Sequence, residues 1–366
     1  MINPHFICPA SGETQPITTT RLVSEAGQPY DLAGLPAFDA SRIVLTNHTI
    51  WRYGPFIAPA DIQPVTLGEG WTPLIRLPGE QERVFLKLEG LNPTGSFKDR
   101  GASVLVSVLA AEGARGVHDD SSGNAGAALA AYSAAAGLNA RLYVPAYASP
   151  AKLNQISLHG AALHPVEGPR SAATQAAVAE QETAYASHAH HPFIIAANRT
   201  IAYEIWEQLG RNAPDVVVMP VGHGTQLLGV ARGFNALRDA GLIERVPRLI
   251  GVQAEACAPL YARLHGESGA GEGQTLAEGI RIINPVRGDA VVRAAVDSGG
   301  TIITVSEDAI VSGLRALAQR GIFGEPTCAV VWPAYEALRP TLSPGSTVIL
   351  SITGNGLKTP DLHTFM

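Results

Sequence analysis

The sequence predicts an α/β protein built on parallel β-sheets, and three observations favour this prediction. Short apolar segments recur along the chain, and alanine-rich segments of helical length separate most of them. These short segments are apolar throughout, which is typical of parallel strands covered by helices on both faces. The chain has 366 residues, and at about 150 residues per domain this length indicates two domains.

Strands and helices are expected to alternate from residue 84 onward, whereas residues 1–80 are rich in turns and prolines and are expected to pack over the body of the protein. The expected strands cover residues 84–88, 141–144, 162–166, 193–195, 216–219, 249–252, 301–305 and 347–350. The expected helices cover residues 97–112, 125–136, 172–186 and 309–319, and another begins near residue 227. Because ligands bind beyond the carboxyl ends of parallel strands, the loops that follow these strands are the candidate sites.

The composition excludes several classes of protein. The chain is 46% hydrophobic and 16% charged, so it can bury a large core and is not disordered. Its net charge of −6 offers no basic surface for nucleic acid. Cys8, Cys257 and Cys328 are far apart, which favours free thiols in a reducing compartment. With no signal peptide and no apolar stretch near the ~20 residues of a membrane span, a cytoplasmic protein is expected.

The loop at residues 92–96 is expected to open a helix that carries Lys98 in its first turn. Ser96 is of a type that caps helices. The positive end of the helix dipole disfavours a protonated amine there, which makes Lys98 a better nucleophile. The alternative is a capped helix with exposed charges. Asp99 and Arg100 are expected to orient the helix by local pairing, as a minor interaction at the surface.

The loop at residues 220–226 follows an apolar strand and precedes a helix. Its glycines allow backbone N–H groups to approach an anion, and the helix N-terminus favours a phosphate. A dinucleotide-binding fingerprint requires glycine at position 227, which is Leu227. A small phosphorylated ligand is therefore expected, and a nicotinamide-dependent oxidoreductase is a weaker alternative.

Two further loops are less specific when each is taken alone. Residues 121–126 bring two hydroxyls, a glycine and an amide to a helix start, where they suit a carboxylate or a phenolate, although a simple helix cap also explains them. Thr353 follows the last strand and would project a hydroxyl at its end, although a surface turn explains residues 353–358 equally well.

Taken in order, these segments resemble one enzyme family. LEGLNPTGSFKDRGA, SSGNAGAA, PVGHGTQ and SITGNGLK, with WRYGPF and LGEGWTPL upstream, resemble the pyridoxal-phosphate enzymes of the threonine synthase group. These enzymes have fold type II and belong to the tryptophan synthase β-like superfamily. The resemblance implies two parallel-sheet, three-layer domains with pyridoxal 5'-phosphate in the cleft between them. Residues 1–96 and 198–366 would form the larger domain, which binds the cofactor phosphate, and residues 97–197 the smaller, which carries the lysine helix.

The resemblance also implies a role for individual residues. Lys98 matches the lysine that forms a Schiff base with the cofactor and later moves protons. Asn124 matches the amide that binds the cofactor's ring oxygen, and Thr353 the hydroxyl beside the pyridine nitrogen. The remaining cofactor residues, which match the phosphate-binding loop, are Gly222, His223, Gly224, Thr225 and Gln226. The residues that match the substrate carboxylate loop are Ser122, Gly123 and Ala125. Glu69 and Glu325 lie in similar motifs without an assigned role.

The reaction implied first is that of threonine synthase, O-phosphohomoserine and water to threonine and phosphate. Residues 194–204 depart from the segment that holds the substrate phosphate in that group, and Arg199 is the candidate that replaces it. This segment and residues 276–280 are more similar to threonine or serine dehydratases, so an ammonia-lyase acting on a hydroxy or diamino acid is the alternative. A non-catalytic binding protein is disfavoured by the intact Lys98.

The expected partners are a small amino-acid substrate and, as the resemblance implies, a second copy in a homodimer. Neither nucleic acid nor a membrane is expected. His188, His190 and His191 lie in a polar stretch and are expected to be solvated rather than to bind zinc, so no metal is expected.

Overall fold

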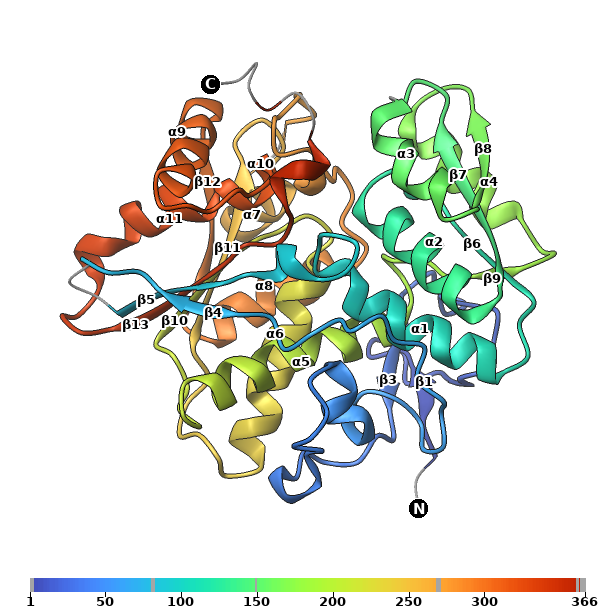
Figure 1. Cartoon of the computed structure of the whole chain (residues 1–366), viewed down its shortest axis with the longest axis horizontal. Helices are drawn as coiled ribbons and strands as arrows, with labels where there is room; N and C mark the ends of the chain where they lie inside the picture. Colours follow the sequence, from blue (N-terminus) through green and yellow to red (C-terminus); the bar gives the residue numbers. More distant parts are fainter. Residues whose placement is uncertain (1–2, 80–82, 149, 268–270, 360–361, 363–366) are drawn as a thin grey trace. The chain divides into compact units, whose positions relative to one another are not determined.

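The computed structural model describes residues 3–79, 83–148, 150–267, 271–359 and 362, and the chain forms two compact units (Figure 1). Unit 1 comprises residues 1–70, 92–94 and 98–197, and unit 2 comprises residues 71–91, 95–97 and 198–366. The sequence-based division placed residues 1–96 with the C-terminal part of the chain, whereas the contacts place residues 1–70 in unit 1.

Unit 2 is built on a six-stranded sheet with the order β12-β11-β10-β13-β5-β4. Its strands are β4 (Leu74–Arg76), β5 (Arg83–Lys87), β10 (Val216–Pro220), β11 (Arg248–Ala254), β12 (Thr301–Val305) and β13 (Thr347–Ser351). All pairings are parallel except that of the edge strand β4 with β5. Every residue of the central strands β10 and β13 is buried, as expected for a sheet covered on both faces. The strands expected at these five longer segments are confirmed.

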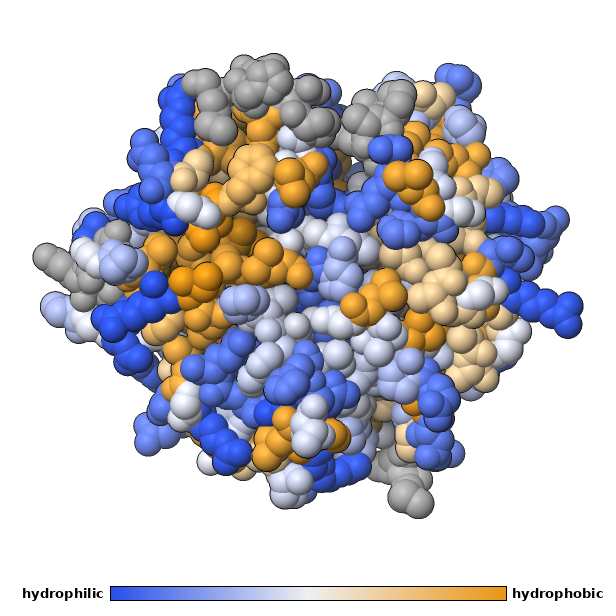
Figure 2. Space-filling view, viewed as in Figure 1, coloured by the Kyte–Doolittle hydropathy of each residue, from blue (hydrophilic) through white to orange (hydrophobic). Residues whose placement is uncertain are grey.

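The helices of unit 2 cover this sheet and supply a hydrophobic core that runs from Leu77 to Leu362. They are α6 (Thr225–Asp239), α7 (Pro259–His265), α8 (Gly288–Asp297), α9 (Glu307–Ala318), α10 (Pro326–Ala329) and α11 (Val331–Leu338), with short 3₁₀ turns η3 (Glu89–Leu91), η4 (Glu278–Ile280), η5 (Arg339–Thr341) and η6 (Gly356–Lys358). Figure 2 shows hydrophobic side chains on the face of unit 2 seen in this view, and Ile75 of the edge strand β4 is 42% exposed.

Unit 1 contains a four-stranded parallel sheet with the order β8-β7-β6-β9. Its strands are β6 (Gly116–Asp119), β7 (Asn139–Pro145), β8 (Ala162–Val166) and β9 (Ala184–Tyr185). Its helices are α1 (Lys98–Ala111), α2 (Asn124–Ala136), α3 (Pro150–Leu158) and α4 (Arg170–Ala179). The helix expected at 172–186 is too long, because α4 ends at Ala179 and residues 184–185 pair with β6 as strand β9.

The strand expected at residues 193–195 is wrong. These residues lie in α5 (Pro192–Gln208), a helix of 17 residues. Phe193, Ile194 and Ile195 are all buried, although consecutive residues point to different sides of a helix. Because a short run that is apolar throughout has no periodicity, its sequence does not distinguish a strand from a helix. Arg199 therefore lies inside a helix and not at the end of a strand.

The N-terminal residues join unit 1 through contacts with α1. The indole N–H of Trp51 donates a 2.9 Å hydrogen bond to Ser103 Oγ, and the amide of Val65 donates one of 2.7 Å to Ser107 Oγ. Phe6 and Ile50 share a hydrophobic cluster with Val104 and Phe193. This part also contains two 3₁₀ turns, η1 (Ala40–Arg42) and η2 (Ile50–Phe56), and an antiparallel sheet of the three strands β1 (His5–Ile7), β2 (Thr14–Pro16) and β3 (Asp31–Ala33).

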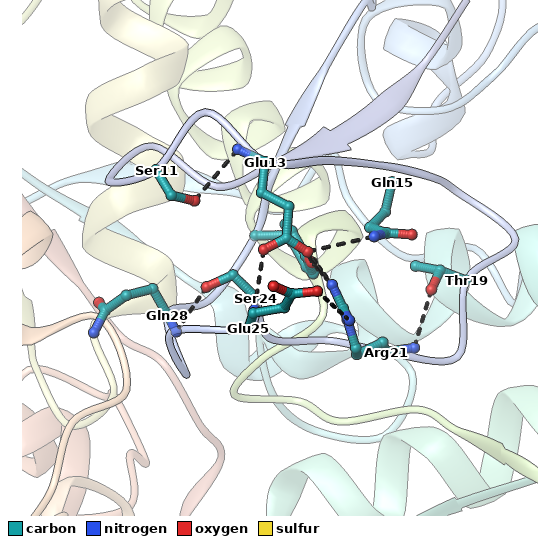
Figure 3. Close-up of polar contacts among 9 residues, drawn as sticks. Ser11, Glu13, Gln15, Thr19, Arg21, Ser24, Glu25 and Gln28 are labelled. Carbon is teal, nitrogen blue, oxygen red and sulfur yellow. Dashed lines mark hydrogen bonds and ion pairs between the residues drawn. The ribbon is translucent and has the colours of Figure 1, made fainter.

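Glu13 is the centre of the polar contacts in this N-terminal part (Figure 3). Its carboxylate pairs with Arg21 and accepts hydrogen bonds from the Tyr30 hydroxyl at 2.5 Å and from the amide of Glu25 at 3.0 Å. The hydrogen bond from Tyr30, more than any other interaction, lowers the pKa of Glu13 below its ordinary value.

Within the described residues, no helix has both the length and the apolar character needed to span a bilayer.

Candidate active site

Residues 220–226, here called the phosphate-type loop, lie in unit 2 at the sheet edge where β10 and β13 end. These strands are parallel neighbours, with Val218 opposite Leu350, so the loops that follow them start at the same edge of the sheet. The side-chain amide of Gln226 donates a 3.0 Å hydrogen bond to Ser351 Oγ. The structure therefore brings the predicted residues 222–226 and Thr353 to neighbouring positions.

Gly222 and Gly224 shape this loop. Gly224 has a φ of 78° and precedes α6 as its N-cap, and no described side chain caps the helix there. A Cβ on Gly224 would approach Val291 Cγ2 to 2.3 Å, and one on Gly222 would approach Ile282 Cγ1 to 2.9 Å. The N-terminus of the 15-residue helix α6 favours a phosphate, because its first N–H groups and the positive end of the helix dipole attract an anion.

Thr353 carries a buried hydroxyl without a hydrogen-bond partner in the described part of the chain. The residue is 2% exposed, and its Oγ1 has no hydrogen-bond partner among the described residues. A buried polar atom without a partner is costly, so it points to a ligand group that completes it. A pyridine nitrogen, which accepts a hydrogen bond, fits this hydroxyl.

Glu325 lies beside the Thr353 loop. Its amide donates a 3.1 Å hydrogen bond to the carbonyl of Gly354, and a Cβ on Gly354 would lie 2.3 Å from Glu325 Cδ. Cys328 Sγ is 3.1 Å from the carbonyl oxygen of Glu325, and burial raises the pKa of this thiol. The motif around Glu325, noted without a role in the sequence, therefore packs against the end of β13.

Lys98 is the first residue of α1, as expected. The expectation that Asp99 and Arg100 interact at the surface is wrong in its location, because both side chains are fully buried. The Asp99 carboxylate accepts a 2.7 Å hydrogen bond from the amide of Thr94 and another from its hydroxyl. Asp99 thereby fixes the loop that precedes Lys98.

The substrate-type loop of unit 1 runs from β6 into α2. Asn124 is the first residue of α2, and Gly123 precedes it with φ −113° and ψ −145°. A Cβ on Gly123 would have no atom within 4 Å, whereas one on Gly126 would lie 2.0 Å from the carbonyl oxygen of Ser121. Ser122 is half-buried and Ala125 is buried. The loop therefore packs tightly on its α2 side and leaves space beside Gly123.

Arg199 lies in the interior of α5, where this helix packs on α6. A Cβ on Gly233 would lie 2.6 Å from the carbonyl oxygen of Arg199, and one on Gly229 would lie 2.3 Å from Asn198 Cβ. These glycines lie one and two turns beyond Thr225 in α6. The structure therefore does not bring Arg199 to the start of α6 together with the phosphate-type loop.

A cluster that the sequence did not predict adjoins the loop of unit 1. His188 Nδ1 lies 2.8 Å from Asp119 Oδ2, and Asp120 follows directly. The expectation that the three histidines are solvated is wrong for His191, which is 4% exposed and stacks on Phe193. Recognition of β6 as a strand would have placed the two aspartates at a strand end and revealed the cluster.

Comparison with known proteins places this geometry in a family. The family model "Pyridoxal-phosphate dependent enzyme" matches residues 65–354, so the chain belongs to the pyridoxal-phosphate-dependent enzymes, and pyridoxal 5'-phosphate is its cofactor. The chain is 36% identical over 327 residues to threonine synthase of Synechocystis sp., covering 85% of this chain and 84% of that protein. It is 32% identical over 351 residues to threonine synthase of Methanosarcina acetivorans, covering 90% and 85%.

Solved structures agree with this assignment and with fold type II. A threonine deaminase from T.th. superposes with a TM-score of 0.66 at 28% identity, over 78% of this chain and 92% of that one. An L-serine ammonia-lyase of Rhizomucor miehei gives a TM-score of 0.70 at 24% identity, over 83% and 98%, which supports the fold.

Proposed function

We propose that the protein is a lyase of the threonine synthase type that converts O-phosphohomoserine and water to threonine and phosphate. The observation that carries this proposal is the buried hydroxyl of Thr353, which has no partner among the described residues and lies at the strand edge where α6 begins. The curated threonine synthases, 32–36% identical over most of the chain, support the reaction type.

The residues present fit the cofactor. The backbone N–H groups of Gly222–Gln226, His223 among them, would bind its phosphate at the start of α6, and Thr353 would donate its hydroxyl to the pyridine nitrogen. Asn124 would bind the ring oxygen, and Lys98 would hold the cofactor covalently. When bound, pyridoxal phosphate withdraws electrons from the substrate Cα and so stabilises negative charge there. A neutral hydroxyl at the pyridine nitrogen limits that withdrawal, which restricts the reactions available.

The substrate is handled by the chain's own groups. Ser122, Gly123 and Ala125 would bind the α-carboxylate through hydroxyl and backbone donors, and the open space beside Gly123 supports this role. The amine of Lys98 would remove the proton at Cα and return it later. Arg199 remains the candidate ligand for the substrate phosphate, although it lies within α5.

Product analysis tests the proposal. The purified protein, reconstituted with pyridoxal phosphate, is incubated with O-phosphohomoserine, and the products are followed by NMR. Threonine and free phosphate are expected. Lys98→Ala is expected to lose turnover and the bound chromophore, and Lys98→Arg, which keeps the charge, is expected to lose both as well. Full activity of Lys98→Ala contradicts the assignment.

An ammonia-lyase is the second candidate function. Residues 194–204 and 276–280, whose sequence is more similar to threonine or serine dehydratases, favour it. The similarity to the T.th. threonine deaminase points the same way. In that case serine, threonine or diaminopropionate yields a keto acid and ammonia while phosphohomoserine is inert. Phosphohomoserine kinetics that are unchanged in Arg199→Ala exclude Arg199 as the phosphate ligand.

We also propose that the protein acts in a reducing compartment, the cytoplasm. All three cysteines are buried free thiols, which supports this location. The homodimer implied by the family resemblance stays a prediction, which sedimentation equilibrium of the holoenzyme tests.

A further inference from the structure

We propose that Asp119, Asp120 and His188 form a binding site for a divalent transition-metal ion within unit 1. One ligand atom from each of the three residues lies within 4.8 Å of the others. The proposal concerns metal binding and does not depend on the reaction proposed above.

The sheet of unit 1 brings the three residues together. Asp119 ends β6, and Val117 and His118 of β6 pair in parallel with Ala184 and Tyr185 of β9. The carboxyl ends of these strands are therefore adjacent, and the segment after β9 carries His188 back to β6. His188 Nδ1 lies 2.8 Å from Asp119 Oδ2. An ion bound by both atoms would replace this direct contact with two metal–ligand bonds of about 2.0–2.2 Å.

Asp119 supplies the independent observation that points to a ligand. Its side chain is 1% exposed, and Oδ1 has no hydrogen-bond partner in the part of the chain that the structure describes. A carboxylate oxygen in this position has lost its water without gaining a donor. A bound cation at the cluster compensates this loss more fully than any neutral group.

Asp120 leaves one oxygen for the ion. Its Oδ2 accepts hydrogen bonds from Thr174 Oγ1 at 2.5 Å and from Arg170 Nη1 at 3.1 Å. Its Oδ1 has the Tyr185 hydroxyl at the long distance of 3.4 Å. The Arg170 side chain is 43% exposed, so its guanidinium can turn toward solvent and reduce its repulsion of a cation.

The ligand set selects the kind of ion. Two carboxylate oxygens and one imidazole nitrogen suit Zn²⁺ or Mn²⁺. Ca²⁺ instead requires about six to eight oxygen ligands. Water would complete the coordination. The ion would tie the end of β6, the start of the Ser121–Asn124 loop and the segment after β9 to one point, and so position that loop.

Calorimetric titration of the holoenzyme with ZnCl₂, and separately with MnCl₂, tests the proposal. One site per chain is expected, with Asp119→Asn and His188→Gln each weakening binding at least tenfold. CaCl₂ is expected to bind at least tenfold more weakly. The control Asp289→Asn, an exposed carboxylate paired with Arg263 in α7, is expected to bind like the unchanged protein.

A second readout separates metal binding from folding. Asp119→Asn keeps a side-chain oxygen that can accept the hydrogen bond from His188 Nδ1, so its thermal midpoint in chelator is expected to lie close to that of the unchanged protein, while the increase on adding metal disappears. Absence of binding heat overturns the proposal, as does metal affinity that is unchanged in both variants. Either result is independent of which reaction the enzyme catalyses.

Discussion

The backbone amide of Phe97 donates a 3.0 Å hydrogen bond to the carbonyl oxygen of Thr353. The amide of Asn355 donates in turn to the carbonyl of Gly95 at 2.9 Å. The main chain that leads into Lys98 is therefore attached to the loop with the buried hydroxyl. Since these bonds use backbone atoms, the side chain of Thr353 can be changed without breaking them.

Thr353→Val is expected to separate cofactor binding from stability. Valine keeps the shape of threonine but removes Oγ1, which has no partner among the described residues. The apo protein is expected to be as stable as before, or more stable by about 1 kcal/mol, because no hydrogen bond is lost. Pyridoxal phosphate affinity, followed by the visible absorbance of the bound cofactor, is expected to fall by about tenfold.

The matched control for this variant is Thr341→Val, at an exposed threonine of unit 2. It is expected to leave cofactor affinity unchanged. If Thr353→Val destabilises the apo protein and binds the cofactor normally, the hydroxyl serves the fold and not the ligand.

Gly224→Ala is expected to damage the phosphate-type loop. An alanine there must adopt a φ of 78° and approach Val291 to 2.3 Å, which costs about 1 kcal/mol in backbone strain and more in repacking. Pyridoxal phosphate affinity is expected to fall at least tenfold, as measured by equilibrium dialysis.

Gly123→Ala is the comparison, because its Cβ meets no atom within 4 Å and its φ of −113° suits any residue. Stability and cofactor affinity are expected to stay unchanged while the substrate KM rises. Equal loss of cofactor affinity in both glycine variants would contradict the separate roles of the two loops.

Much of the fold follows from local pattern, and the exceptions have physical causes. The parallel strands of unit 2 are predicted because they are apolar along their whole length. Residues 193–195 are misread because three apolar residues carry no period, and the helix they begin becomes recognisable only from its tertiary packing. The membership of residues 1–70 in unit 1 depends on contacts such as Trp51 with Ser103, which no local pattern encodes.

In the candidate site, too, the features encoded by local sequence are predicted and those that depend on long-range contacts are not. Lys98, Asn124 and Thr225 are found at helix starts because glycine and hydroxyl residues before a helix have a strong local signature. The pairing of Asp119 with His188 spans 69 positions, so it requires the strand pairing of β6 with β9. Long-range polar clusters of this kind are not accessible from spacing along one sequence.

The buried ion pair of unit 2 is expected to be essential for stability. Lys87 Nζ lies 2.7 Å from Glu204 Oε2 and also donates to the carbonyl of Thr72 and to Gln208. Lys87→Met leaves Glu204 buried without its cation, and a loss of about 3–5 kcal/mol in unfolding free energy is expected. Urea denaturation measures this loss, and the double variant Lys87→Met/Glu204→Leu is expected to recover part of it. A single variant that loses less than about 1 kcal/mol contradicts this assignment.

The contribution of Glu180 in unit 1 to the free energy of unfolding is expected to depend on pH. Its carboxylate accepts a 2.5 Å hydrogen bond from the Tyr143 hydroxyl and pairs with Arg141 at 3.3 Å. The bond from Tyr143 is the main cause that lowers the pKa of Glu180 from 4.5 to about 2. A carboxyl whose pKa is lower in the folded state stabilises the protein above its unfolded pKa, and this contribution is lost as the pH falls through the folded value.

Glu180→Gln is therefore expected to lose about 1 kcal/mol of unfolding free energy at pH 7, and the difference from the unchanged protein is expected to shrink as the pH falls from about 5 toward 2. Urea denaturation at a series of pH values measures it. Glu182→Gln is the matched control, because Glu182 pairs with the same Arg141 at 2.7 Å but is 75% exposed, where an ion pair contributes little. A deficit of Glu180→Gln that stays constant down to pH 3 would exclude the ionised carboxylate as its source, since the Tyr143 hydroxyl would then bind the neutral side chain equally well.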